Sequence, residues 1–315
     1  MSDIVLEIKD LTKYYGSHLA LDHVNLRVPR GSIYGLLGRN GSGKTTAIKL
    51  VLGLLRPTAG TAQILGCDSQ EITPAVRQRI GYVTEGHRLP GWMQIRELEK
   101  FQRPFYPDQW DGKLFHEMLD YFELSPNRKV KQMSNGQRGQ ISLALTMASS
   151  PELLIMDDPT LGLDTAIRRQ FLEGMIRLIQ REEKTILFSS HILSDVERVV
   201  DRIAVLDKGM VRADCPLEEF RSAIRKFRFR FKNAIPADIH LAGLLHRRQK
   251  GRDLELTLAG TRTEQIDAWA AEADIEYYKE LNMNLEDQFI EYTEPPNSTR
   301  LFLWENEHDE VYRPA

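Results

Sequence analysis

A glycine-rich stretch near the N-terminus has the residue types and spacing that bind phosphate. Residues 38–45 read Gly-Arg-Asn-Gly-Ser-Gly-Lys-Thr and match the pattern G-x-x-x-x-G-K-[ST]. Glycines let backbone N–H groups converge on a phosphate, and the N-terminus of a following helix adds a favourable dipole. Lys44 can then bridge two phosphates of a nucleotide, and the Thr45 hydroxyl can ligate Mg²⁺. The predicted nucleotide contacts are Gly38, Asn40, Gly41, Ser42, Gly43, Lys44, Thr45 and Thr46.

Two neighbouring carboxylates follow an apolar run in the middle of the chain. Residues 153–156 read Leu-Leu-Ile-Met, and Asp157 and Asp158 come next. A continuous apolar run predicts a buried parallel strand, and parallel sheets bind ligands at the carboxyl ends of their strands. We therefore expect Asp157 to hold Mg²⁺ through water, opposite Thr45.

Residues 133–137, Met-Ser-Asn-Gly-Gln, complete a pattern that resembles a known family. With the two motifs above, they resemble the ATP-binding cassette (ABC) ATPases over residues 4–225, because the family signature is Leu-Ser-Gly-Gly-Gln. The resemblance implies that Ser134, Gly136 and Gln137 contact the γ-phosphate of ATP held by a second protomer. Asn135 replaces the first signature glycine. Since asparagine tolerates positive φ better than most residues, we expect this departure to be mild.

The resemblance assigns roles to three further positions. Tyr15 matches the aromatic residue that stacks on adenine, with Tyr14 or a purely structural tyrosine as the alternatives. Asp164, in Leu-Gly-Leu-Asp, matches a loop that crosses the dimer interface, and a simple helix N-cap is its alternative. His191, after the strand that ends in Ser-Ser, matches the histidine that contacts the γ-phosphate.

Two residues depart from the family at catalytic positions. The family has glutamate where Asp158 stands, and this glutamate polarises the attacking water. Aspartate is one methylene shorter, and a misplacement near 1 Å can cost about 10²-fold in rate. We therefore expect slow hydrolysis, unless the loop before Pro159 has moved to compensate. Glu85 replaces a glutamine that senses Mg²⁺ and links to the membrane subunit; a surface glutamate without a role is the alternative.

The elements that must position these residues alternate between strands and helices, which predicts a mainly parallel, helix-covered sheet of the α/β class. The resemblance implies a P-loop ABC cassette over residues 1–225, with an N-terminal antiparallel β subdomain and a helical subdomain at about 86–150. The aromatic residues from Trp92 to Phe122 are read chiefly as the core of that subdomain, with a groove for a membrane partner as the alternative. The expected strands are two over residues 4–28, then 33–37, 80–84, 153–156 and 185–189, with a helix over 47–55.

A second, smaller α+β domain is expected over residues 226–293. Residues 226–232 alternate basic and phenylalanine side chains, which favours an amphipathic strand over a site for single-stranded nucleic acid. Further strands are expected at 254–258 and 275–278, and helices at 263–273 and 285–292. Residues 294–315 are read as an acidic tail.

Composition excludes several classes of protein. The 315 residues carry 42 basic and 45 acidic side chains, so there is no basic excess to bind nucleic acid or an anionic membrane surface. Two distant cysteines fit neither a disulfide framework nor a zinc site. No signal peptide and no run of about 18 apolar residues is visible, which favours a cytoplasmic protein whose membrane role needs a partner.

The resemblance therefore implies an ATPase that binds ATP and Mg²⁺, forms a head-to-tail homo- or heterodimer, and powers a separately encoded membrane permease. Residues 284–290 resemble the C-terminal helix of export-type ATPases, which favours export and a peripheral position on the cytoplasmic face of the membrane. The alternative is a soluble or regulatory ABC ATPase with weak hydrolysis because of Asp158. No nucleic-acid partner is expected, since the chain has one cassette and no coiled-coil insertion.

Overall fold

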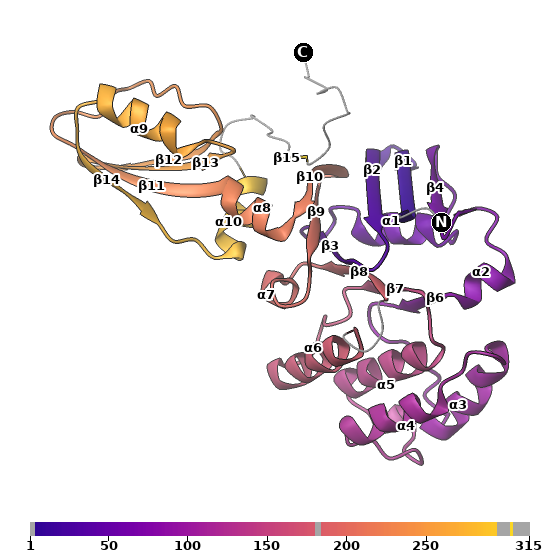
Figure 1. The fold of residues 1–315 in the computed structure, drawn as a ribbon. Coiled ribbons are helices and arrows are strands. Elements are labelled where there is room, and N and C mark those ends of the chain that lie inside the picture. The colour runs from indigo at the N-terminus through magenta and orange to yellow at the C-terminus, as the bar shows by residue number, and fades with distance from the viewer. Residues whose placement is uncertain (1–3, 180–183, 295–302, 305–315) are drawn as a thin grey trace. The chain divides into compact units, whose positions relative to one another are not determined.

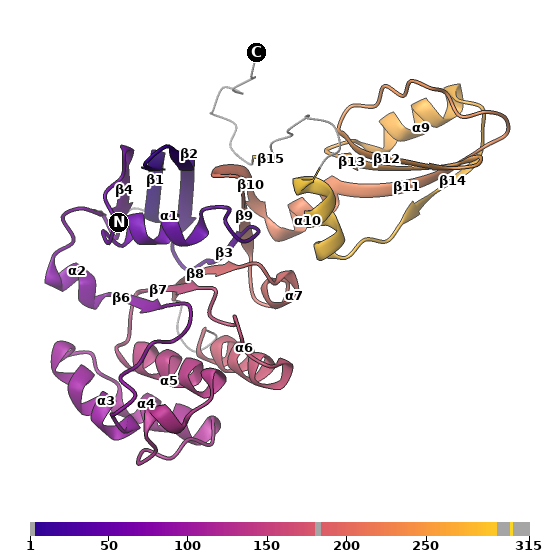
Figure 2. The same cartoon turned by 180° about the vertical axis from the view of Figure 1, so that it is seen from behind.

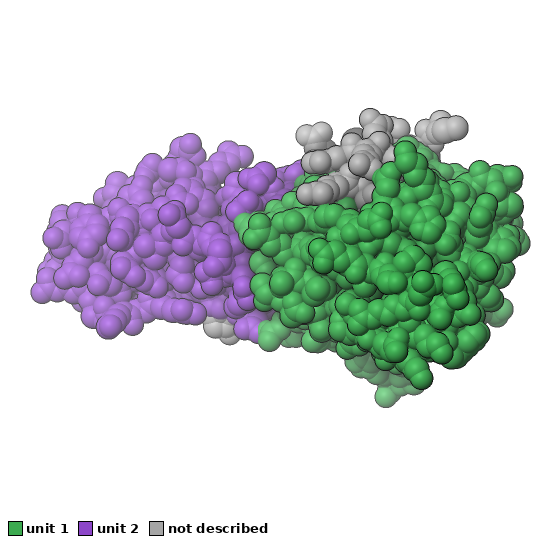
Figure 3. All heavy atoms as spheres, turned by 90° about the horizontal axis from the view of Figure 1, so that it is seen from below, with its two compact units in different colours: residues 1–211 green, residues 212–315 purple. Residues whose placement is uncertain are grey.

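The computed structural model describes residues 4–179, 184–294 and 303–304 (Figures 1 and 2). The chain divides into two compact units, residues 1–211 and 212–315, which are coloured separately in Figure 3. No helix in the described residues is long and apolar enough to cross a membrane.

The first unit begins with an antiparallel sheet in the order β2-β1-β4-β5. Its two long strands were predicted as short ones over residues 4–28, and each has 12 residues. In β2 the alternation of Val24, Leu26 and Val28 with exposed neighbours buries one face of the strand. The strands are β1 (Ile4–Tyr15), β2 (His18–Pro29), β4 (Ala59–Ile64) and β5 (Cys67–Asp68).

The second sheet of this unit confirms the predicted parallel core. Its strands run parallel in the order β9-β3-β8-β7-β6, so their carboxyl ends lie along one edge. All five residues of β7 and all six of β8 are buried, as continuous apolar runs predict. The strands are β3 (Ile33–Leu37), β6 (Ile80–Val83), β7 (Leu153–Asp157), β8 (Thr185–Ser190) and β9 (Arg202–Asp207).

Helix α1 (Lys44–Val51) joins the two sheets through a shared core. Ile48 of α1 belongs to the same buried cluster as Leu26 of β2 and Leu36 of β3. Full burial of such side chains contributes about 1.5–3 kcal/mol each. The N-terminus of α1 is therefore fixed directly after the loop that follows β3.

The remaining helices of the first unit include those of the predicted helical subdomain (Figure 1). Its aromatic residues differ in burial: Phe115 and Phe122 are buried, whereas Trp92, Phe101 and Phe105 are 70%, 61% and 57% exposed. The other three, Tyr106, Trp110 and Tyr121, are half-buried. The helices are α2 (Pro74–Gln78), α3 (Ile95–Gln102), α4 (Gly112–Tyr121), α5 (Asn135–Ala148), α6 (Thr165–Ile179) and α7 (Leu193–Val196), with 3-10 turns at Arg103–Phe105 and Val130–Gln132.

The second unit contains an antiparallel sheet in the order β12-β13-β11-β14. Phe227, Phe229 and Phe231 of β11 are buried on one face and form a core with β13 and α9, so the predicted amphipathic strand is confirmed. The elements are β11 (Ile224–Phe231), β12 (Leu244–Lys250), β13 (Asp253–Ala259), α9 (Thr263–Glu272), β14 (Ile275–Leu281) and α10 (Leu285–Thr293).

Helix α10 binds back to the segment that precedes this sheet, β10 (Met210–Pro216) and α8 (Leu217–Ala223). The Tyr292 hydroxyl donates to the Arg212 carbonyl at 2.6 Å, and the Gln288 amide donates to the carbonyls of Arg221 and Ile224 at 2.7 and 2.8 Å. These contacts explain why residues 212–225 cluster with the second unit. Of the predicted tail, β15 (Leu303–Trp304) pairs with β10, and residues 295–302 and 305–315 lie outside the described residues.

Candidate active site

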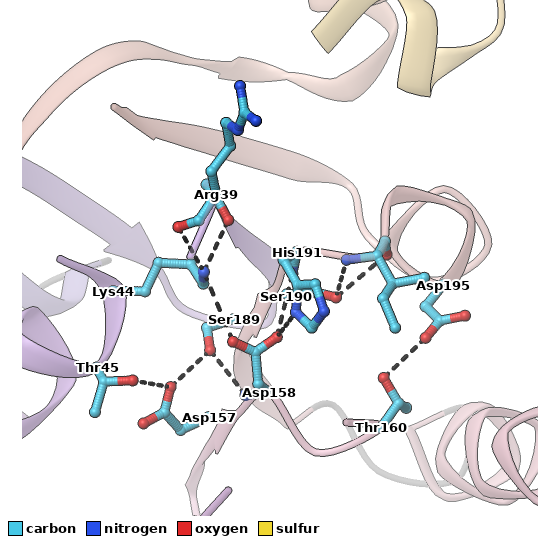
Figure 4. A network of polar contacts seen from close by, with 12 residues as sticks. Arg39, Lys44, Thr45, Asp157, Asp158, Thr160, Ser189, Ser190, His191 and Asp195 are labelled. Atoms are coloured by element: carbon cyan, nitrogen blue, oxygen red, sulfur yellow. Dashed lines mark hydrogen bonds and ion pairs between the residues drawn. The ribbon is translucent and has the colours of Figure 1, made fainter. Parts of the chain in front are cut away.

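The loop between β3 and α1 is wrapped around the amine of Lys44. The Lys44 Nζ donates to the Gly38 carbonyl at 2.8 Å and to the Arg39 carbonyl at 3.4 Å, and the lysine is only 5% exposed (Figure 4). The Ser42 hydroxyl is buried and has no hydrogen-bond partner among the described residues. Buried polar groups are normally hydrogen-bonded, so this hydroxyl is open to a bound ligand or an ordered water.

Two glycines of this loop are required by its close packing. Gly43 has φ of +111°, and a Cβ there would lie 2.6 Å from a methyl group of Leu21 and 2.8 Å from the Ala20 carbonyl oxygen. A Cβ at Gly38 would lie 2.3 Å from the Ser42 hydroxyl. Of the other predicted contacts, Asn40 and Gly41 are exposed, and Thr45 and Thr46 are half-buried.

Asp157, at the end of β7, receives two hydroxyl hydrogen bonds. Thr45 Oγ1 donates to its Oδ1 at 3.1 Å, and Ser189 Oγ of β8 donates to the same oxygen at 2.9 Å (Figure 4). Burial raises the pKa of Asp157; the two hydroxyls oppose this shift, and the charge of Asp158 adds to it. The structure therefore brings the predicted metal-binding pair, Thr45 and Asp157, into direct contact.

Asp158 lies between the lysine of the loop and the histidine after β8. Its Oδ2 is 3.6 Å from Lys44 Nζ, and its Oδ1 is 2.8 Å from His191 Nδ1 and accepts from the His191 backbone N–H at 3.1 Å. The backbone of Asp158 has φ of +44°, in the left-handed region that non-glycine residues seldom adopt. The short carboxylate thus reaches both neighbours from an unusual backbone conformation.

Three contacts that sequence reasoning missed hold the segment that begins with Asp158. Ser189 Oγ accepts from the Asp158 backbone N–H at 2.9 Å, and His87 Nε2 lies 2.9 Å from the Pro159 carbonyl oxygen. Thr160 donates to the buried Asp195 of α7 at 2.8 Å. No motif in the sequence identifies the roles of His87, Thr160 or Asp195. For Ser189, the only indication in the sequence is its place at the end of a predicted strand.

Glu85 is exposed in the loop after β6, and its carboxylate makes no hydrogen bond within the described part of the chain. It does act on the site electrostatically. Burial, together with the charges of Asp157 and Glu85, raises the pKa of Tyr82 to about 12. Negative charge therefore accumulates at this edge of the sheet, which suits a cation.

The signature segment forms the start of helix α5. Ser134 caps the helix: its hydroxyl accepts from the Gln137 N–H at 3.2 Å, and the Gln137 side chain accepts from the Ser134 N–H at 3.2 Å. Gly136 is packed so closely that a Cβ would lie 2.6 Å from Ile167. Asn135 is the first helical residue and does not have positive φ. The prediction that Asn135 needs a positive φ is therefore wrong; the position needs only a residue that is compatible with a helix.

The three other predicted positions are placed as follows. Tyr15 and Tyr14, at the end of β1, are 47% and 44% exposed, so both rings are open to contact. The Asp164 carboxylate accepts from the Ile167 N–H at 3.0 Å, so Asp164 caps α6, as its alternative reading expected. His191 is held by Asp158, as described above.

The donor set at the strand ends fits a magnesium nucleotide. Mg²⁺ prefers hard oxygen ligands, and the Thr45 hydroxyl and Asp157 carboxylate already share one location. The loop after β3 has positive φ at Gly41 and Gly43, a backbone form that turns N–H groups towards an anion. The unsatisfied Ser42 hydroxyl supports the same fit.

Comparisons with known proteins agree with this geometry. A family model described as ABC transporter matches residues 21–161. The bacitracin transport ATP-binding protein BcrA of Bacillus licheniformis is 33% identical over 228 residues, which are 71% of this chain and 73% of the relative. The ABC transporter ATP-binding protein YtrB of Bacillus subtilis is 29% identical over 286 residues, 91% of this chain and 97% of the relative. The Nod factor export ATP-binding protein I of Cupriavidus metallidurans is 33% identical and spans 65% of this chain and 69% of the relative.

Solved structures give the same result. An ATP-binding subunit of an ABC transporter matches 69% of this chain and 92% of its own length, with 28% identity and a TM-score of 0.62. A dimeric ATP-binding cassette in a post-hydrolysis state, bound to ADP and Pi, matches 67% of this chain and 98% of its own length, with 26% identity and a TM-score of 0.60. This chain belongs to the ABC transporter family, as an ATP-binding subunit that hydrolyses ATP to power transport.

Proposed function

We propose that this chain powers an exporter from the cytoplasmic face of the membrane, through a permease encoded separately. The relative named for Nod factor export supports this direction, and the relative named for bacitracin transport supports a role in transport. Residues 284–290, which resemble the C-terminal helix of export-type ATPases, also support it. The exposed Trp92, Phe101 and Phe105 would offer the permease an apolar contact on the helical subdomain.

The observation that carries the proposal is the convergence of Lys44, Asp157, Asp158 and His191 at the carboxyl ends of three parallel strands. Thr45 and Asp157 would hold Mg²⁺, and Glu85 would contribute from its loop. The bound ion supplies neutralising charge for the phosphate oxygens. Lys44 would exchange its carbonyl contacts in the loop for phosphate oxygens, and Tyr15 would stack on the adenine.

Hydrolysis would depend on the pair formed by Asp158 and His191. Asp158 would orient the attacking water and accept its proton as the general base. The hydrogen bond from His191 Nδ1 fixes the direction of that carboxylate, and the ring would contact the γ-phosphate. Because the lysine amine is 3.6 Å from Asp158 Oδ2, Asp158 and the phosphates would compete for Lys44. Binding of nucleotide would thus free the carboxylate for its role.

We further propose a head-to-tail dimer, homo- or heteromeric, in which Ser134, Gly136 and Gln137 contact the nucleotide of the opposite protomer. The N-terminus of α5 favours an anion because its N–H groups and dipole point outwards. Asp164 would lie at the interface. Two solved structures of one cassette to which the chain is similar are described as dimeric. The cassette would comprise residues 1–225, with 226–293 as an accessory domain.

Lys44→Ala tests the proposal directly. We expect the substitution to abolish ATP binding, measured by equilibrium binding of a labelled nucleotide, because Lys44 supplies the charge at the centre of the loop. Lys49→Ala removes the same charge from the same helix and should bind ATP normally. Normal ATP affinity in Lys44→Ala would contradict the assignment of the loop. Purification of the intact protein from detergent-solubilised membranes then tests the transport role, because a permease should accompany it.

A further inference from the structure

His87 is a buried side chain in the loop that carries Glu85. It is 2% exposed, and its Nε2 lies 2.9 Å from the Pro159 carbonyl oxygen. A carbonyl oxygen can only accept, so Nε2 carries the proton and donates. The other ring nitrogen, Nδ1, is buried without a hydrogen-bond partner among the residues that the structure describes. Leaving a buried polar atom such as Nδ1 unsatisfied costs about 1–3 kcal/mol. The ring therefore keeps its contact with Pro159 although Nδ1 has no partner there.

Pro159 directly follows Asp158, whose backbone is strained. A non-glycine residue with φ of +44° costs about 1–3 kcal/mol and persists only where its surroundings hold it. Three hydrogen bonds hold the backbone here: Ser189 Oγ accepts from the Asp158 N–H, the Asp158 carbonyl accepts from the Leu161 N–H at 3.1 Å, and His87 donates to the Pro159 carbonyl. The first two contacts fix the peptide groups on either side of Asp158, and the contact from His87 fixes the peptide group after Pro159.

Helix α5 fixes the histidine ring in turn. A Cβ at Gly139 would lie 2.8 Å from His87 Nε2 and 3.1 Å from Cδ2, so the ring is packed against the bare backbone of the helix. The ring has little freedom to leave the Pro159 carbonyl. His87 thus joins the loop after β6, helix α5 and the segment that begins with Asp158.

From this arrangement, and resting on the proposed role of Asp158, we infer that His87 is a positioning residue for hydrolysis. Its Nε2–H holds the Pro159 carbonyl and thereby directs the Asp158 carboxylate towards the attacking water, without contact with the nucleotide. Loss of the hydrogen bond should lower kcat and leave ATP binding unchanged. Displacement of a catalytic group by about 1 Å costs up to about 10²-fold in rate.

Two amide substitutions isolate this hydrogen bond. The amide nitrogen of glutamine can take the place of Nε2, whereas the amide of asparagine is one methylene too short to reach the carbonyl. We expect His87→Asn to lower kcat about 10- to 100-fold, with KM for ATP within about twofold, and His87→Gln to keep kcat within about threefold. Asparagine adopts the φ of +44° at this position more readily than most residues, so backbone strain would not explain slow turnover in His87→Asn. His116→Asn, on an exposed side chain of α4, is the matched control.

Gly139→Ala gives the same test without changing the histidine, because its methyl group would push the ring from Pro159. We expect the same fall in kcat at constant KM. The inference is overturned if His87→Asn and Gly139→Ala both turn over at the wild-type rate, or if kcat stays normal while only the melting temperature falls. It is also overturned if His87→Gln is as slow as His87→Asn. Asp158→Asn is measured in parallel: normal turnover there contradicts the proposed role of Asp158, on which the inference rests, whatever the variants at position 87 show.

Discussion

At the residue scale, one oxygen of Asp158 binds two N–H groups of His191 while the other faces Lys44. The backbone at φ of +44° turns this side chain towards both partners. A carboxylate with contacts on both oxygens is already restricted to few orientations. Groups that are preorganised in this way contribute most to stabilising a transition state. The shorter side chain is therefore compensated in part by restraint.

Asp158→Asn removes the proposed base and preserves the shape of its side chain. The amide oxygen can still accept from the His191 backbone N–H, so we expect ATP affinity to stay within about threefold. Without a proton acceptor, turnover should fall at least about 10²-fold, the lower end of general-base contributions. Phosphate release and equilibrium nucleotide binding measure the two effects. Unchanged turnover would mean that the role belongs to His191 or to a partner chain.

The sequence predicted some of these residues and not others for a physical reason. Lys44, Thr45 and Asp157 stand in patterns whose local spacing is set by the ligand, so their types alone identify them. His87 lies 72 residues from Pro159 in the chain, and no local pattern records that they meet. Its neighbours Glu85, Gly86 and Arg88 are exposed, but His87 is buried because Gly139 leaves room for its ring.

At the scale of elements, helix α5 begins with a reciprocal cap between Ser134 and Gln137. The same serine is proposed to contact the nucleotide of a second protomer. A cap satisfies an N–H group of the first turn, and a phosphate needs the N–H groups that remain. Ser134 is therefore expected to affect both helix stability and ligand binding, and an experiment has to distinguish the two effects.

Ser134→Asp separates them. Aspartate caps helices as well as serine does, so the melting temperature should stay near that of the wild type, whereas Ser134→Ala should cost about 1 kcal/mol. The added negative charge opposes a phosphate at the helix N-terminus, so ATP-driven dimerisation should be lost in Ser134→Asp. Thermal unfolding and light scattering measure the two effects. A Ser134→Asp protein that dimerises normally would contradict the contact across the dimer.

Helix α10 of the second unit is held by a buried ion pair. Glu291 accepts from Lys226 Nζ at 2.9 Å and from the Thr257 hydroxyl at 2.8 Å, and His246 Nδ1 lies 3.7 Å away. Burial opposes ionisation of Glu291, but these partners outweigh it and lower its pKa below the ordinary 4.5. A lowered pKa in the folded state means that the carboxylate stabilises the fold above about pH 4.5. That stabilisation is lost as the pH falls through the lowered pKa.

Glu291→Gln should therefore destabilise the protein at pH 7 by about 3 kcal/mol, because it leaves the half-buried Lys226 without its partner charge. The difference in unfolding free energy between wild type and variant should shrink as the pH falls below about 4.5. Urea unfolding across that range measures it. Glu286→Gln, on the exposed side of the same helix, is the control and should change little. A variant with the stability of the wild type at pH 7 would show that the pair contributes nothing net.

The same unit shows which elements a single sequence can reveal. Strand β11 was predictable because Phe227, Phe229 and Phe231 alternate with basic residues. Strand β12, Leu244–Lys250, reads Leu-Leu-His-Arg-Arg-Gln-Lys and has no apolar alternation. It forms because β13 offers it a full ladder of backbone partners, which is a property of the neighbouring strand.

At the scale of the whole molecule, the loop between β3 and α1 and the N-terminus of α5 are proposed as separate sites for an anion on one chain. A two-fold, head-to-tail pair would place each loop opposite the other chain's α5, so two nucleotides would be bound with one symmetric interface. ATP would then act as part of the interface. Dimerisation should follow its concentration, since a ligand at 100 times its Kd stabilises the state that binds it by about 2.7 kcal/mol.

Blocked hydrolysis should make this dimer observable. We expect Asp158→Asn to form a dimer with ATP and Mg²⁺ and to be monomeric with ADP, as measured by size-exclusion chromatography with light scattering. Chelation of Mg²⁺ should also return the monomer, because the ion that Thr45 and Asp157 would hold screens the Asp157 carboxylate from the phosphates. The double variant Lys44→Ala/Asp158→Asn is the control and should stay monomeric, since it keeps the blocked base and loses the loop's cation.

A heterodimeric system would need the companion ATPase present, so the co-purified complex is tested in the same way. If Asp158→Asn stays monomeric with ATP in both settings, the loop and α5 do not share a nucleotide, and Ser134 serves only as the cap of its helix.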